Sequence, residues 1–124
     1  MKESVAGVAK HEHLDVFRLA HQLALKIYDL TRSFPRDETW GLAGQLRRAA
    51  VSVPANIAEG AGRLSRAEYR RFVGIARGSA VEVSYYLRLA CDLGYSSKSE
   101  SENLRRQYES VCKMLTRLSQ ALER

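Results

Sequence analysis

The sequence predicts an all-α protein, an antiparallel up-and-down four-helix bundle that assembles as a homo-oligomer. Apolar residues recur at every third or fourth position along most of the 124 residues, and no segment alternates apolar and polar residues as a half-buried strand does. Short connections separate the periodic segments, which favours an up-and-down bundle. Two of the four helices are also apolar on a second side, which predicts self-association.

The first helix is expected over Leu14–Ser33, after a loose N-terminal tail at residues 1–12. Pro35 ends this helix, because proline disfavours helical geometry at the residue before it. Residues 13–124 are expected to form a single domain, since domains of about 100–150 residues are common. The expected core residues of this helix are Leu14, Phe17, Ala20, Ala24, Ile27 and Phe34, with Val16, Leu19, Leu23 and Leu30 beside them.

The second helix is expected to begin near Asp37–Gly41 and to end at Gly60-Ala61-Gly62, where glycine accepts the left-handed conformation of a helix end. Pro54 lies inside it. Proline removes one backbone hydrogen bond, so a kink is expected, without a break because the apolar register continues across Pro54. The expected core residues are Leu42, Leu46, Ala49, Val53, Ile57 and Gly60.

The third helix is expected to begin at a capping box, Ser65-Arg66-Ala67-Glu68, in which the serine and glutamate side chains satisfy free backbone N–H groups. It runs to about Leu93, and Gly94 ends it. Its expected core residues are Tyr69, Phe72, Val73, Ala76, Ala80, Val83, Leu87 and Ala90.

The fourth helix is expected to begin at a second capping box, Ser99-Glu100-Ser101-Glu102, and to run nearly to Arg124. Its apolar positions are spaced alternately by four and three residues, as in helices that pack almost parallel to their neighbours. The expected core residues are Leu104, Tyr108, Val111, Leu115, Leu118 and Leu122.

The second apolar side of the middle helices predicts contact with another copy of the chain, because a single bundle core leaves that side uncovered. The residues expected opposite the core are Ala43, Gly44, Val51, Ala55 and Ala58 in the second helix and Gly74, Val81, Tyr85 and Leu89 in the third. The alternative is that these are ordinary surface apolar residues, which are common and need no partner.

A polar row accompanies this side of the second helix. Its members are Gln45, Arg48, Ser52, Asn56 and Glu59, and Arg71 and Glu82 lie on a comparable flank of the third helix. Buried or interfacial charges must pair, so we expect an ion pair between Arg48 and Glu82 or between Arg71 and Glu59.

Positive charge is concentrated in one part of the chain. The formal net charge is +6, and residues 44–78, with seven arginines and two acids, contribute +5 of it. In the third helix Arg66, Arg70, Arg77 and Arg88 share one face over about 33 Å. A guanidinium binds phosphate through two parallel hydrogen bonds, so these arginines predict a surface for the backbone of RNA or DNA.

Two functions remain open on this charge pattern. The first is non-specific nucleic-acid binding by Arg47, Arg48, Arg63, Arg66, Arg70, Arg77 and Arg88. The second is a protein-interaction scaffold or adaptor that binds no nucleic acid, with the arginines serving assembly. No zinc finger, helix-turn-helix or RNA-recognition motif accompanies the arginines, so sequence-specific recognition is not expected.

Enzymatic, metal and membrane functions are not expected. No apolar run reaches the roughly 18 residues of a membrane span, and the N-terminus lacks the apolar region of a secretory signal, so a cytoplasmic location is expected. Cys91 and Cys112 are expected to be reduced helix residues. His11-Glu12-His13 is expected to be a polar tail, because nothing completes a metal site. Ser52 and Ser79 lack a histidine partner, and no cofactor motif is present.

The string from Leu46 to Gly60, LRRAAVSVPANIAEG, closely resembles the signature of the bacterial 23S rRNA-intervening sequence protein family of four-helix bundles. Further matching positions are Leu14-Asp15-Val16-Phe17, Phe34-Pro35, Arg63, Arg71-Phe72, Ile75-Ala76-Arg77-Gly78-Ser79 and Glu82. The resemblance covers about residues 13–122. Phe17 stands where relatives commonly carry tryptophan, which should preserve packing.

The resemblance implies a cytosolic antiparallel bundle that forms a homopentamer. Some relatives are encoded within rRNA intervening sequences, and others are accessory variability determinant proteins of diversity-generating retroelements, which bind nucleic acid and a reverse transcriptase. The resemblance makes Arg47, Arg48, Arg63 and Arg77 candidate functional or interface residues. It also makes Ser52, Pro54, Asn56, Gly60 and Gly78 candidate structural residues. Together with the residue patterns above, the expected interface or structural set is Val51, Ser52, Pro54, Asn56, Glu59, Gly60, Arg71, Gly78, Glu82 and Tyr85.

Overall fold

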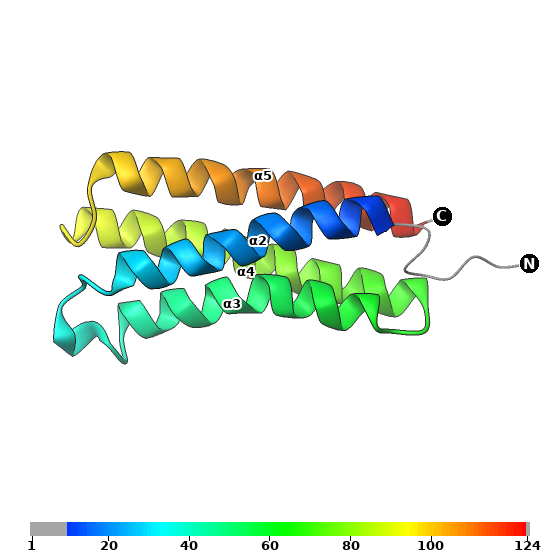
Figure 1. Cartoon of the computed structure of the whole chain (residues 1–124), viewed down its shortest axis with the longest axis horizontal. Coiled ribbons are helices and arrows are strands. Elements are labelled where there is room, and N and C mark those ends of the chain that lie inside the picture. The colour runs from blue at the N-terminus through cyan, green and yellow to red at the C-terminus, as the bar shows by residue number, and fades with distance from the viewer. Residues whose placement is uncertain (1–9, 124) are drawn as a thin grey trace, which may run out of the picture.

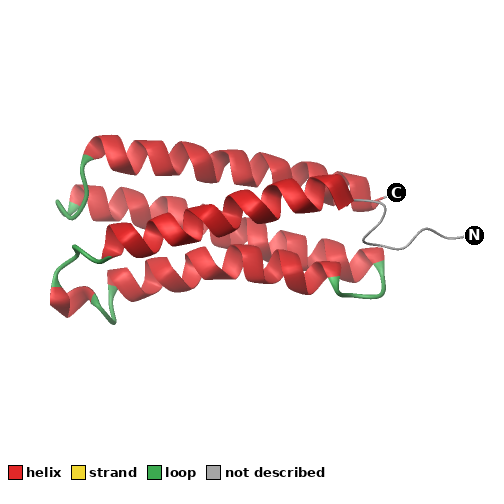
Figure 2. Ribbon diagram, in the orientation of Figure 1, coloured by secondary structure: helices red, strands yellow, loops and turns green. Residues whose placement is uncertain are grey.

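The computed structural model describes residues 10–123, which contain four long α-helices, one short 3-10 helix and no strand. The elements are α2 (Lys10–Thr31), η1 (Arg36–Glu38), α3 (Leu42–Ala61), α4 (Arg66–Asp92) and α5 (Lys98–Glu123). The long helices lie side by side, and successive connections lie at opposite ends of the molecule (Figures 1 and 2). The expected all-α class is confirmed for the described residues.

Helices that follow one another in the chain pack together, and the first also packs on the last. Helix α4 packs against both α3 and α5, while α2 lies against α3 and α5. Their apolar sides form one continuous core, in which Tyr69, Tyr108, Leu23, Ile27 and Leu115 are fully buried. Within residues 10–123, no helix has the length and apolar character that crossing a membrane requires.

Helix α2 begins at Lys10, four residues before the expected start at Leu14, so residues 10–12 are helical and do not belong to a tail. The rest of the expected tail lies outside the described residues. The interpretation of His13 as part of a polar tail is wrong. Its ring lies against Phe17, its Nδ1 is 2.8 Å from the Tyr69 hydroxyl of α4, and partial burial lowers its pKa.

The core register of α2 differs from the expected one. Val16 and Leu23, expected beside the core, are fully buried, whereas Leu14 and Phe17, expected in it, are only half-buried. Ala20, Ala24, Ile27 and Phe34 are buried as expected. Apolar residues cover such a wide arc of this helix that its periodicity alone does not fix which part faces the core.

The core positions expected for α3 are all buried, and the helix continues through Pro54. The expectation that Ala43 and Gly44 lie on an outer face is wrong, because both are buried. A Cβ atom at Gly44 would lie 2.7 Å from the Thr39 carbonyl oxygen, so the connection before α3 folds closely over the first turn of the helix.

The ends of α3 and α4 use different geometries. Gly62, the C-terminal cap of α3, has a φ of −84° and not the expected left-handed conformation. Gly94 has a φ of +84°, its N–H donates to the Cys91 carbonyl, and the next N–H, of Tyr95, donates to the Ala90 carbonyl. This pair of bonds is a Schellman motif, which confirms Gly94 as the residue that ends α4.

Serine side chains cap the starts of α4 and α5. Ser65 Oγ accepts a hydrogen bond from the Glu68 N–H at 3.1 Å, as expected. At α5 the expected box at Ser99 is wrong, because the reciprocal bonds join Ser97 and Glu100. Core positions in both helices match the expected residues except for Phe72, which is half-buried.

The Tyr108 hydroxyl is buried without a hydrogen-bond partner among the described residues. Burial raises the pKa of this phenol, so it stays protonated. We expect Tyr108→Phe to raise the free energy of unfolding by about 1 kcal/mol, because it removes an unsatisfied buried polar group and leaves the ring in place. Urea denaturation measures the change. A loss of stability would show that the hydroxyl has a partner in solution.

Candidate nucleic-acid interface

The candidate arginines do not form one surface but lie at three places on the bundle. Arg47 lies between α3 and α2, Arg63 and Arg71 lie around Phe72 where α3 meets α4, and a third group lies along α4 next to α5. The third group consists of Arg66, Arg70, Arg77 and Arg88.

The side chains of Arg70 and Arg77 cross from α4 to α5. Arg70 Nε donates to Ser119 Oγ at 3.1 Å, and its Nη2 is 3.7 Å from Glu123 Oε2. Arg77 Nε donates to Thr116 Oγ1 at 3.1 Å. These contacts hold both guanidinium groups over the junction of α4 and α5.

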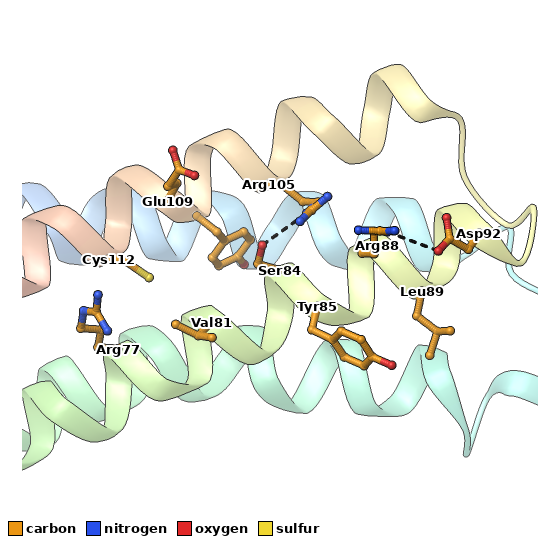
Figure 3. Close-up of a pocket in the computed structure, with 11 residues that line it drawn as sticks. Arg77, Val81, Ser84, Tyr85, Arg88, Leu89, Asp92, Arg105, Glu109 and Cys112 are labelled. Carbon is orange, nitrogen blue, oxygen red and sulfur yellow. Dashed lines mark hydrogen bonds and ion pairs between the residues drawn. The ribbon is translucent and has the colours of Figure 1, made fainter.

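A groove of about 580 Å³ runs along this junction and contains three arginines, Arg77, Arg88 and Arg105. Figure 3 shows that Arg105 comes from α5 and the other two from α4. Arg105 Nε donates to the Ser84 hydroxyl at 3.4 Å. Reasoning from the sequence missed Arg105, because the side of α5 that faces α4 follows from packing and not from charge clustering.

The groove contains two carboxylates, Asp92 and Glu109, against its three arginines, so its charge is only partly neutralised. Arg88 pairs with Asp92 at 3.3 Å, but Arg77 and Arg105 donate to neutral hydroxyls and have no carboxylate within 4.0 Å among the described residues. Burial raises the pKa of the Cys112 thiol in the same groove, which keeps this cysteine protonated. The groove therefore suits an anion better than a nucleophilic reaction.

Arg47 has the contacts of a structural residue. Its Nε donates to Thr31 Oγ1 at 2.8 Å, and its guanidinium lies 5.0 Å from the centre of the Tyr28 ring. Thr31 is buried, and its hydroxyl in turn donates to the Ile27 carbonyl. Arg47 thus joins α3 to the end of α2 and is held away from the α4–α5 groove.

The expected ion pair between Arg71 and Glu59 is not formed within the chain, because each of the two residues pairs with a residue three or four positions away. Glu59 Oε2 lies 2.8 Å from Arg63, and Arg71 Nε lies 3.4 Å from Glu68. Arg63 and Arg71 both stack on the Phe72 ring, at 4.7 and 4.6 Å. A carboxylate three or four residues away along the chain is already close to the arginine, so the local pair forms.

The expected pair of Arg48 and Glu82 is also not formed, since no Arg48 nitrogen lies within 4.0 Å of a carboxylate among the described residues. Tyr86 of α4 is close enough to both charges to feel them, and its hydroxyl donates to Gln45 Oε1 at 3.1 Å. Burial and the nearby Glu82 carboxylate raise the pKa of Tyr86.

The rest of the expected interface set divides between core and surface. Pro54 and Gly60 are buried inside the monomer. The Ser52 hydroxyl lies 2.8 Å from the Ser79 hydroxyl and accepts from the Asn56 amide, which links α3 to α4. Of the residues expected on the second apolar side, Val51, Ala55, Ala58, Gly74, Val81 and Tyr85 are exposed and Leu89 is half-buried. Ile75, Gly78 and Glu82 are exposed on the same side of α4, and we call these nine exposed residues the outer face.

Comparison with known proteins identifies the family. The model of the family described as 23S rRNA-intervening sequence protein matches residues 12–117. The chain belongs to this family. The match confirms the resemblance found in the string from Leu46 to Gly60. A search of curated proteins gave no match.

A solved structure shares the fold of this 23S rRNA-intervening sequence protein. It is the crystal structure of a protein of unknown function from the S23 ribosomal protein family of Bacteroides thetaiotaomicron. The TM-score is 0.82 at 23% sequence identity, and the match covers 88% of this chain and 98% of the other. At that identity the likeness concerns the fold alone.

This 23S rRNA-intervening sequence protein also has exposed aromatic and aliphatic residues that were not among the expected site residues. Trp40, in the connection before α3, is 87% exposed, and Leu64, between α3 and α4, is almost fully exposed. Neither belongs to the string from Leu46 to Gly60. Within the described residues, no group of three histidine, cysteine or acidic side chains is placed to hold a metal ion.

Proposed function

We propose that this protein is a non-enzymatic, cytoplasmic homo-oligomer that binds the backbone of RNA or DNA without sequence specificity. The α4–α5 groove supports this function, because Arg77 of α4 and Arg105 of α5 both line it, at different levels, without a carboxylate partner within 4.0 Å. Arg66 and Arg70 extend the positive side of α4 beyond the groove. Guanidinium groups in such a row contact successive phosphates and read no bases.

The proposed assembly is an antiparallel up-and-down bundle that self-associates through the outer face, as a homopentamer by family resemblance. The outer face supports this proposal, because Val51, Ala55 and Ile75 are exposed there beside Gly74 and Gly78. Small residues allow two helix surfaces to approach closely, and exposed apolar residues gain free energy when a second copy covers them. In such an assembly the arginine groove repeats, which raises the avidity for a long polyanion.

The alternative is a protein-interaction scaffold or adaptor without nucleic-acid binding, for which a reverse transcriptase is the candidate partner. Several arginines favour it, because Arg63, Arg70, Arg71 and Arg88 already lie within 4.0 Å of carboxylates of the same chain. A salt titration separates the two functions, since binding to a phosphate backbone releases counterions and binding to a protein need not.

We expect the variant with Arg66, Arg70 and Arg77 all changed to glutamine to bind nucleic acid more weakly and with a smaller salt dependence. Each lost phosphate contact reduces the slope of log affinity against log salt by about 0.7–0.9, so three contacts reduce it by about two. Fluorescence anisotropy with a labelled duplex and a labelled single strand, from about 50 mM salt upwards, measures the slope.

The matched control changes Arg18, Arg32 and Arg36 to glutamine, which removes the same charge from exposed positions of α2, of the turn after it and of η1. Sedimentation equilibrium checks that both variants keep the parent mass, which we expect to be a multiple of the 14.0 kDa chain. Equal slopes for the two variants, or no binding of either probe by the parent protein at low salt, would refute nucleic-acid binding by the groove and favour the adaptor.

A further inference from the structure

We propose that the α4–α5 groove is a site for single-stranded nucleic acid, with one phosphate on Arg77, another on Arg105 and an unpaired base against Tyr85. This inference rests on the proposed function and specifies its ligand. It also assigns Val81 and Tyr85 to ligand binding and takes both out of the proposed oligomer interface, which then uses the other residues of the outer face.

The first observation is that charged and apolar side chains form two adjacent rows along α4. Arg77 and Arg88 lie on the side of α4 nearest α5. Val81, Tyr85 and Leu89 lie next to them, on the side turned away from α5 (Figure 3). Val81 is 50% exposed and Tyr85 is 58% exposed. Five side chains of α4 line the groove, namely Arg77, Arg88, Val81, Tyr85 and Leu89. A ligand that lies along α4 in this groove therefore meets cations on one side and apolar surface on the other.

The second observation is that two guanidinium groups of the groove are fixed but have unused donors. Arg77 and Arg105 each use Nε to donate to a hydroxyl, and their terminal nitrogens make no hydrogen bond to a described residue. The Thr116 hydroxyl donates to the Cys112 carbonyl at 3.0 Å, so the group that binds Arg77 is itself held in place. A phosphate that enters the groove therefore finds preorganised donors, which lowers the entropy cost of binding.

The third observation is that the apolar row includes an exposed aromatic ring. A tyrosine ring stacks on the face of an unpaired base, and such stacking tolerates any base because every base has a π-face. Bases in a duplex are stacked on one another and paired, so a duplex presents only phosphates and groove edges to this surface. The side-by-side rows thus match a single strand, whose phosphates and bases are both accessible.

The volume of the groove agrees with this ligand. About 580 Å³ lies within the range of roughly 300–1,000 Å³ that is typical of sites for small organic ligands, so it admits a nucleotide unit. The groove is open along the helices, and Arg70 and Arg66 continue the positive row of α4 beyond it. A strand can therefore leave the groove and stay in contact with cations.

The test compares Tyr85→Ala and Tyr85→Phe in the full-length protein. The probes are a labelled oligothymidylate of about 20 nucleotides, which exceeds the usual site size of a single-strand-binding module, and the same strand paired with oligodeoxyadenylate. We expect Tyr85→Ala to weaken binding of the single strand by about tenfold and to leave duplex binding unchanged. Tyr85→Phe should retain parent affinity, because it keeps the ring. Trp40→Ala, which removes an exposed aromatic residue outside the groove, is the control and should have no effect.

Other results overturn the inference in distinguishable ways. Equal affinity of Tyr85→Ala and parent protein for the single strand removes Tyr85 from the site, although non-specific backbone binding then still stands. A reduced mass of Tyr85→Ala in sedimentation equilibrium, with parent affinity per chain, assigns Tyr85 to the oligomer interface. Failure of the parent protein to bind either probe refutes the proposed function itself.

Discussion

Replacing Leu115 by alanine is expected to lower the free energy of unfolding by about 2–5 kcal/mol. Leu115 is fully buried at the centre of α5, which packs against α4 and also against α2. Truncation removes the transfer free energy of the lost methyl groups and leaves a cavity between rigid helices, which collapse only partly. Urea denaturation monitored by helical circular dichroism measures the loss.

Leu25→Ala is the matched control for this prediction. Leu25 lies on α2 and is 56% exposed, so the same chemical change should alter stability by no more than about 0.5 kcal/mol. A loss for Leu25→Ala as large as that for Leu115→Ala would mean that this side of α2 is covered by a partner in solution. A small loss for Leu115→Ala would contradict the arrangement of the core.

Gly60→Ala is expected to destabilise the protein by about 1–3 kcal/mol, although alanine is the better helix former. A Cβ atom at Gly60 would lie 2.9 Å from Tyr69 Cδ1 and 3.1 Å from the Tyr69 carbonyl oxygen. Tyr69 is fully buried and its backbone belongs to α4, so neither atom can move freely. The added methyl group must push α3 and α4 apart.

Gly78→Ala supplies the opposite result. No atom of the same chain lies within 4 Å of a Cβ at Gly78, so alanine there should stabilise α4 of the single chain by about 0.5–1 kcal/mol, measured at a protein concentration low enough to dissociate any oligomer. Thermal and urea denaturation at one protein concentration compare the two variants. Equal effects of the same sign would refute the close approach of α3 and α4 at Gly60, since helix propensity alone would then explain both.

Most core residues of α3, α4 and α5 could be predicted from the sequence, whereas for α2 only part of the core could. Helix α5 shows why, because polar residues fill most positions outside its single row of buried apolar residues, so only one side is apolar enough to be buried. In α2, apolar residues cover a broad arc. Whether Val16 or Phe17 is fully buried then depends on how the helix is rotated against α3 and α5, which local periodicity does not specify.

The start of α5 shows a second limit. Ser97 and Ser99 are each followed three residues later by a glutamate, so both satisfy the pattern of a capping box. The structure uses Ser97, and Ser101 lies inside the helix, where its buried hydroxyl donates to the Leu87 carbonyl of α4 at 3.0 Å. This contact between helices selects one of two locally equivalent starts.

The sequence by itself determined the family, the number of long helices and the residues that line most of the core. Apolar periodicity and the string from Leu46 to Gly60 carry that information locally. Only the tertiary structure decided which charges meet, because ion pairs and hydrogen bonds depend on how one helix is rotated against the next. It confined Arg47 between α2 and α3, paired Arg71 within its own helix, and brought Arg105 of α5 into the same groove as Arg77 of α4.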